Sequence, residues 1–148
     1  MKRQIVALLL MVAPALAAPP ARLHLQVFTY EGIEYICQVA NGRVWYEFNG
    51  KRLAERPLKP TEIEQLEAAL RQQRFQDLPS RIITATIDSR DTVTVWHGGK
   101  PKTVEATTSY QGKLQPQFKR FQVILQAIRR IAPIPGAQIE KLRSQAAP

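Results

Sequence analysis

An Asn-Gly pair at positions 41 and 42 restricts the fold of this chain more than any other feature of its sequence. The pair separates residues 34–39 from residues 43–48, and both segments are rich in β-branched and aromatic residues. Two such segments joined by Asn-Gly are typical of a β-hairpin, because a type I′ turn needs a positive φ at both central residues. The sequence therefore predicts an antiparallel hairpin over residues 34–48.

Other segments show the two-residue alternation of half-buried strands. Residues 23–28 alternate in this way, and residues 82–87 are a further strand candidate whose inward face the pattern leaves uncertain. Segments 91–96 and 103–107 flank a Gly-containing loop at 97–102, which predicts a second hairpin. The residues expected to face inward in this second hairpin are Val93, Val95, Val104 and Ala106.

Two segments have the 3.6-residue period of amphipathic helices. The first begins at a capping box of Thr61 and Glu64 and runs to about residue 74 or 75. Its apolar stripe consists of Ile63, Leu66 and Leu70. The second ends at Pro133 and Pro135, and its apolar stripe consists of Phe118, Phe121, Leu125 and Ile128.

These elements predict an α+β fold, in which an antiparallel sheet of two hairpins carries two amphipathic helices packed on one face. Residues 18–135 are expected to form this single domain. Residues 136–148 are a C-terminal tail, which is either a short docked helix or a frayed end.

The N-terminal segment has the three parts of a cleavable signal peptide. Lys2 and Arg3 form a basic region, residues 5–13 are apolar, and an Ala-x-Ala site ends at Ala17. The apolar run is too short to cross a bilayer, so residues 1–17 are expected to be removed and the chain is not expected to span a membrane. The predicted location is the periplasm or the outside of the cell. The one cysteine, Cys37, has no partner for an intramolecular disulfide.

No set of residues predicts an enzyme, a metal site or a cofactor site. Cys37 alternates with apolar neighbours and is interpreted as a small buried side chain, and His24 and His97 lack the spacing of metal ligands. Asp88 and Asp91 are interpreted as turn formers that stay ionised. We therefore expect no catalytic residue, no bound metal and no cofactor.

The net charge of +9 indicates weak attraction to acidic surfaces. Its Lys and Arg residues are spread along the chain without a basic block, so specific nucleic-acid binding is not expected. Trp45 and Trp96 remain candidates for contact with a partner, because Tyr46 and Phe48 share the phase of the expected core. A basic domain associated with an anionic cell-envelope polymer is one functional interpretation.

The order of features resembles the emfourin-type inhibitors of thermolysin-like metalloproteases. The resemblance is carried by residues 43–48, by the helix start at 58–66, by the Phe-x-x-Leu-Pro motif at 75–79 and by the Gly-Gly hairpin at 92–104. Residues 30–33 read Tyr-Glu-Gly-Ile, where that family usually has a glycine-rich Gly-Gly-Phe-like segment. The resemblance implies a non-enzymatic domain that binds an exported protease. The sheet edge and the second hairpin, with Trp96 and His97, are the expected contact surface.

Overall fold

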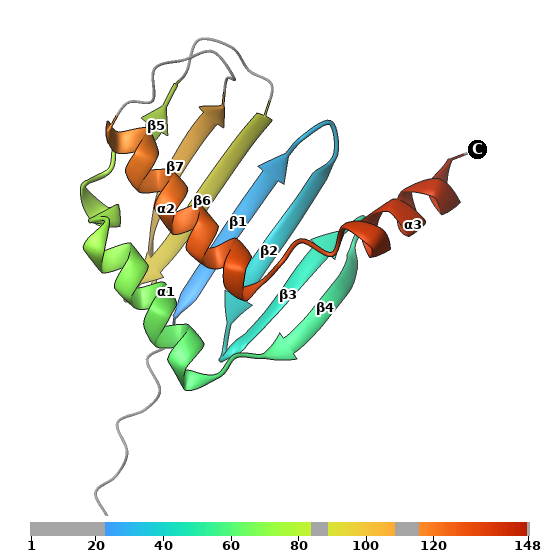
Figure 1. Cartoon of the computed structure of the whole chain (residues 1–148), viewed down its shortest axis with the longest axis horizontal. Coiled ribbons are helices and arrows are strands. Elements are labelled where there is room, and N and C mark those ends of the chain that lie inside the picture. Colours follow the sequence, from blue (N-terminus) through green and yellow to red (C-terminus); the bar gives the residue numbers. More distant parts are fainter. Residues whose placement is uncertain (1–22, 84–88, 109–115, 148) are drawn as a thin grey trace, which may run out of the picture.

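The computed structural model describes residues 23–83, 89–108 and 116–147. Its centre is a seven-stranded sheet in the order β4-β3-β2-β1-β6-β7-β5 (Figure 1). The mixed α+β class is confirmed, although the sheet is larger than two hairpins and a third helix follows the two that were expected. The strands are β1 (His24–Tyr30), β2 (Glu34–Ala40), β3 (Arg43–Phe48), β4 (Lys51–Pro57), β5 (Arg81–Ile82), β6 (Ser89–His97) and β7 (Lys100–Thr108).

Both predicted hairpins are present. Asn41 and Gly42 connect β2 to β3 with φ angles of 52° and 71°, as the type I′ turn requires. Gly98 and Gly99 connect β6 to β7 with φ angles of 55° and 79°, so the second hairpin has a two-residue turn instead of the expected longer loop. The four residues predicted to face inward in this hairpin are buried, and they are Val93, Val95, Val104 and Ala106.

Strands β4 and β5 were not predicted with these bounds. Among the described strands, β4 pairs with β3 alone, and none of its residues is fully buried, so its sequence has no apolar alternation to reveal it. Its register shifts between Val44 and Tyr46 of β3, and Ala54 has a φ of 51°. Strand β5 is limited to two residues and pairs in parallel with β7. The rest of the strand predicted over 82–87 lies largely outside the described residues.

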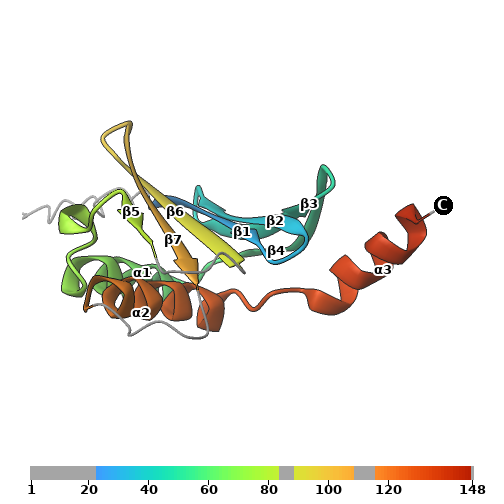
Figure 2. The ribbon, with the colours of Figure 1, turned by 90° about the horizontal axis from the view of Figure 1, so that it is seen from above.

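Helices α1 (Pro60–Gln72) and α2 (Pro116–Ile131) lie together on one side of the sheet (Figure 2). The capping box of α1 is two residues earlier than predicted. The backbone N–H of Lys59 donates to Oε2 of Glu62 over 2.8 Å, because Pro60 suits the first helical position and starts the helix before Thr61. A short 3₁₀ helix, η1 (Phe75–Asp77), follows α1.

The core lies between these two helices and the sheet. Alternate residues of β1, β2, β3, β6 and β7 face the helices and meet the predicted stripe of α2. Cys37 is among them at 3% exposed, which confirms the interpretation of a buried side chain, and this burial raises the pKa of its thiol to about 12. The largest buried side chains supplied by the helical side are Leu66, Phe75, Leu78, Phe118, Phe121 and Ile124.

Asp91 is not a turn residue, and that interpretation was wrong. It lies within β6 with its side chain on the helix side, 4% exposed, and its Oδ1 accepts hydrogen bonds from Thr29 over 2.8 Å and Arg129 over 3.0 Å. Arg129 comes from α2, so a distant cation makes burial of the carboxylate possible. Asp88, its expected companion, lies outside the described residues.

The C-terminal tail is helical and forms α3 (Gly136–Ala146). Its anchor is Ile139, which is 3% exposed. The next turn, at Leu142, borders a small hollow with Asn49 of the β3–β4 connection and Lys51 of β4. Beyond this anchor α3 extends away from the rest of the molecule (Figure 1).

Candidate functional site

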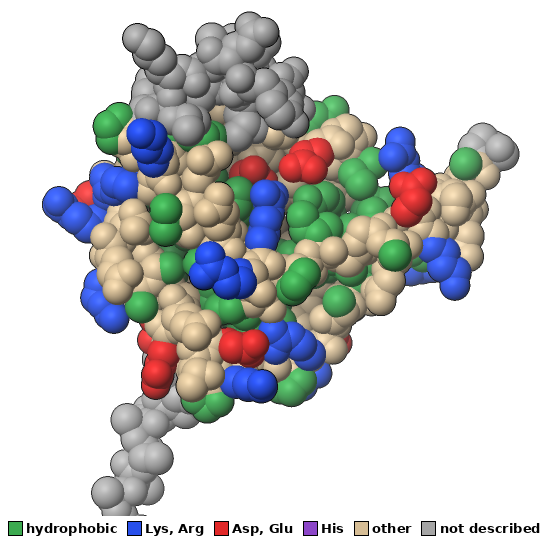
Figure 3. Space-filling view, viewed as in Figure 1, with side chains coloured by type: hydrophobic (Ala, Val, Ile, Leu, Met, Phe, Trp, Pro, Cys, Tyr) green, Lys and Arg blue, Asp and Glu red, His purple; other side chains and the backbone are tan. Residues whose placement is uncertain are grey.

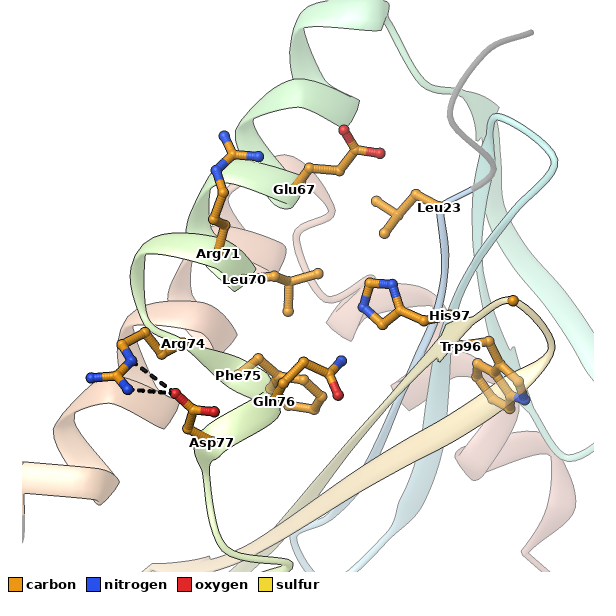
Figure 4. Close-up of a pocket in the computed structure, with 11 residues that line it drawn as sticks. Leu23, Glu67, Leu70, Arg71, Arg74, Phe75, Gln76, Asp77, Trp96 and His97 are labelled. Atoms are coloured by element: carbon orange, nitrogen blue, oxygen red, sulfur yellow. Dashed lines mark hydrogen bonds and ion pairs between the residues drawn. The ribbon is translucent and has the colours of Figure 1, made fainter.

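A groove of about 720 Å³ opens between the C-terminal part of α1, η1 and the β6–β7 hairpin (Figure 4). Its volume is within the range of small-ligand sites. The described residues around it are Leu23, Glu67, Leu70, Arg71, Arg74, Phe75, Gln76, Asp77, Trp96, His97 and Gly98.

The groove lies between the sheet and the helix layer, at the end of the domain where core packing stops. Leu23 has the same strand phase as Leu25, and His97 has the same phase as Val95, so both face the helix layer. Leu70 and Phe75 close the opposite wall, at 9% and 2% exposed. Figure 4 shows the His97 ring directed across the hollow toward Leu70. The groove therefore has an apolar floor that joins the core.

Charged residues form the rim. Arg74 has a φ of 50°, which turns the chain out of α1 and into η1, and its side chain pairs with Asp77 over 2.7 Å. Glu67 and Arg71 are one helical turn apart on α1, and Figure 4 shows the Glu67 carboxylate on the side of Leu23. The described rim carries two Arg and two acidic side chains, so their charges balance.

An arginine of α2 fixes this wall of the groove. Nε and Nη2 of Arg120 donate to the backbone oxygen of Gln73 over 2.8 and 2.6 Å, and Nη2 also donates to that of Arg74 over 2.9 Å. These carbonyls lie at the end of α1, where the backbone lacks helical partners and a cation is favourable. The wall is thereby tied to α2 before any ligand binds.

The three residues predicted to contact a partner do not form one surface. Trp96 and His97 are adjacent at the end of β6 and so point to opposite faces, and Figure 4 shows the Trp96 ring on the far side of the strand from His97. There the Trp96 ring stacks on His24 with ring centres 4.0 Å apart. Trp45 lies on the same helix-free face of the sheet, on β3, and outside the groove.

The groove offers apolar contacts on its floor and charged side chains at its rim. Its described lining has no Ser, Cys or Lys that could act as a nucleophile, and His97 is its one imidazole. In the described part of the chain, no group of three or more His, Cys, Asp or Glu is placed to hold a metal ion. Sequence reasoning identified Trp96 and His97 but missed the opposite wall. The sequence pattern does not show where α1 stops relative to the hairpin.

Several basic residues have structural partners. Arg56 of β4 makes a bidentate pair with Glu62 over 2.9 and 3.0 Å and donates to the backbone oxygen of Ile131 over 2.6 Å. Lys102 donates to the backbone oxygen of Leu78 over 2.7 Å. With Arg120 and Arg129, these side chains connect elements of the fold. On the helix side the remaining Lys and Arg are spread over the surface (Figure 3).

The sequence matches no protein-family model and no curated protein. Among the described residues, no helix is both long and apolar enough to cross a bilayer. We therefore infer the function from the groove and from the two faces of the sheet.

Proposed function

We propose that the chain is an exported, non-enzymatic binding domain that takes apolar side chains of a partner protein into the groove. The apolar floor of Leu23, Leu70 and Phe75 within a charged rim carries this proposal. Protein contacts that supply most of the binding energy have this arrangement, with a desolvated apolar centre and a polar border. The tie between Arg120 and the end of α1 supports it further, because a preformed site loses little conformational freedom on binding.

The partner that we propose is an exported protease, and the domain would act on it as an inhibitor. Gly98 of the two-residue Gly-Gly turn lines the groove, so a partner that fills the groove also contacts this turn. The alternative, an anionic cell-envelope polymer, is less well supported. Four of the basic side chains, Arg56, Lys102, Arg120 and Arg129, already contact carbonyls or carboxylates of the fold.

The test compares two Trp substitutions on exposed residues. Gln76→Trp places an indole at the groove, and Gln65→Trp places the same group on α1 outside its lining. The mature protein should inhibit a thermolysin-like protease at stoichiometric amounts, including in about 0.5 M salt, where separated surface charges are screened. Gln76→Trp should weaken inhibition about tenfold or more, as loss of a central contact does, and Gln65→Trp should not.

Circular dichroism and thermal melting of both variants serve as the folding control. Failure to inhibit any secreted metalloprotease, together with salt-labile binding to an anionic polymer, would eliminate the inhibitor proposal. Inhibition that is unaffected by Gln76→Trp would show that the contact with the protease lies outside the groove.

A further inference from the structure

The sheet face opposite the helices carries an ordered row of uncharged side chains. Strand register places five residues directly across from one another on β3, β2, β1, β6 and β7, and they are Trp45, Gln38, Gln26, Thr94 and Thr103. The row is about 19 Å long, since neighbouring strands lie about 4.8 Å apart. In Figure 2 none of the described helices covers this face, and the β6–β7 hairpin and the β3–β4 turn both rise on this side.

The polar members of the row keep hydrogen-bonding capacity toward solvent. Nε2 of Gln38 donates to Oε1 of Gln26 over 3.1 Å, which fixes both amides. An amide has two donor hydrogens and an acceptor oxygen, so this bond leaves the Nε2 group of Gln26 and the oxygen of Gln38 available. The hydroxyls of Thr94 and Thr103 share one hydrogen bond of 3.0 Å and keep further acceptor capacity. The row therefore presents both donors and acceptors.

Two tryptophan rings flank these polar groups, and each is held by a neighbour. Nε1 of Trp45 donates to Glu47 over 2.8 Å, and the Arg52 guanidinium lies 4.3 Å from the ring centre. Trp96 lies two residues after Thr94 and on the same face, and its ring is stacked on His24 with 11° between the ring planes. Rings that are already fixed lose little rotamer freedom when a ligand packs against them.

The charges around the row argue against a polyanionic ligand. In the neighbouring cross-strand row, Glu47 and Glu105 stand at the two ends, with Ile36, Phe28 and Thr92 between them. Arg52 over Trp45 and Arg90 over Phe28 balance these carboxylates, so the charges around the row give no net attraction for a polyanion. Its chemistry suits a ligand that has many hydroxyl groups, apolar C–H faces and no charge.

We propose that this open face, defined by Trp45, Gln38, Gln26, Thr94 and Thr103, is a binding site for an uncharged glycan chain. The amides and hydroxyls bond to sugar hydroxyls, and the fixed indoles pack against the C–H faces of sugar rings. None of these five residues lines the groove, although Trp96 borders both sites. One domain can thus bind a glycan on the open face of the sheet and a protein partner in the groove on the helix side.

The experiment uses the mature chain with two neutral probes, a β-1,4-linked glucose hexasaccharide and a β-1,4-linked N-acetylglucosamine hexasaccharide. Binding is measured by isothermal titration calorimetry and by tryptophan fluorescence. We expect at least one probe to bind with an affinity that about 0.5 M salt leaves unchanged, because screening acts on charged contacts. Trp45→Ala and Gln26→Leu should each weaken binding about tenfold, the loss typical of a central contact.

Gln126→Leu, an equivalent change on the exposed side of α2, is the matched control and should bind as the unmodified chain does. Absence of binding to both hexasaccharides, or binding unaffected by Trp45→Ala in a folded variant, would overturn the proposal. Concentration-dependent dimerisation that Trp45→Ala abolishes would also overturn it, since a second copy would then occupy the face. Neither result depends on protease inhibition, so the two proposals can fail separately.

Discussion

The two faces of the sheet stabilise their polar groups in different ways. On the helix side, Asp91 is buried, and its partners come from β1 and from α2. On the open side, Gln26 and Gln38 are half-buried and bond to one another within the same sheet layer. The first arrangement depends on tertiary packing, whereas the second needs only strand register. Changes on the helix side should therefore alter stability, and changes on the open side should alter binding.

The largest effect that this comparison predicts is that of Asp91→Ala. The substitution leaves Arg129 and the hydroxyl of Thr29 without their acceptor below the helices, so we expect a loss of about 3 kcal/mol in the free energy of unfolding. Urea denaturation followed by circular dichroism measures it. Glu47→Ala, which removes a carboxylate from the open face, is the matched change and should have a much smaller effect. Equal losses of unfolding free energy in the two variants would show that the two faces do not differ in this way.

An intermediate effect is expected at the border of the helix side, for Glu62→Gln. The hydrogen bonds from Arg56 and then the one from the Lys59 backbone hold the pKa of the Glu62 carboxyl below its usual range. A lowered pKa stabilises the folded state above the carboxyl's ordinary pKa, and this stabilisation disappears as pH falls through the folded-state value.

Near neutral pH the free energy of unfolding of the unmodified chain should thus exceed that of Glu62→Gln. The difference should be only about 1 kcal/mol, because the Arg56–Glu62 pair is partly exposed. The difference should shrink once the pH is below about 4.5, where the unfolded carboxyl takes up its proton. Unfolding midpoints measured from neutral pH down to acidic pH test both the size and the sign. A difference that grows toward acid would contradict the assignment.

The smallest effect is predicted for Gln38→Ala on the open face. Its hydrogen bond to Gln26 is partly exposed, so the free energy of unfolding should stay within about 0.5 kcal/mol of the unmodified value. Thermal melting provides the measurement. A loss comparable to that of Asp91→Ala would show that the open face contributes to stability as the helix side does, and would remove the distinction.

Much of the fold was predictable because local signals agree with the tertiary arrangement. The Asn41-Gly42 turn and the stripe of α2 around Phe121 and Leu125 have the geometry that their spacing predicts. Strand β4 was not predictable in this way, because it has no fully buried residue and Leu53 is the one leucine in it, so its sequence has no apolar period. The burial of Asp91 depends on Arg129, which is distant in sequence and close only after folding.

The candidate site was predictable only in part. Its hairpin wall was identified through His97, but the opposite wall depends on α1 ending at Gln72 and on the turn at Arg74, which local spacing placed only approximately. His97 was expected in the loop after residues 91–96, so strand alternation did not apply to it, and the shorter turn at Gly98 and Gly99 extends β6 through His97. The two side chains therefore point to opposite faces of the sheet, and their contact with a partner stays a prediction.

The irregular geometry of β4 has a consequence for self-association. A regular outer strand offers a ladder of free backbone groups on which further copies can polymerise. In β4 the left-handed conformation of Ala54 and the shifted register interrupt that ladder, and Arg52 and Glu55 add charge along it. Concentrated solutions should therefore resist fibril growth from this edge, and replacing Ala54 by a β-branched residue such as Val would strain the same backbone that provides the protection.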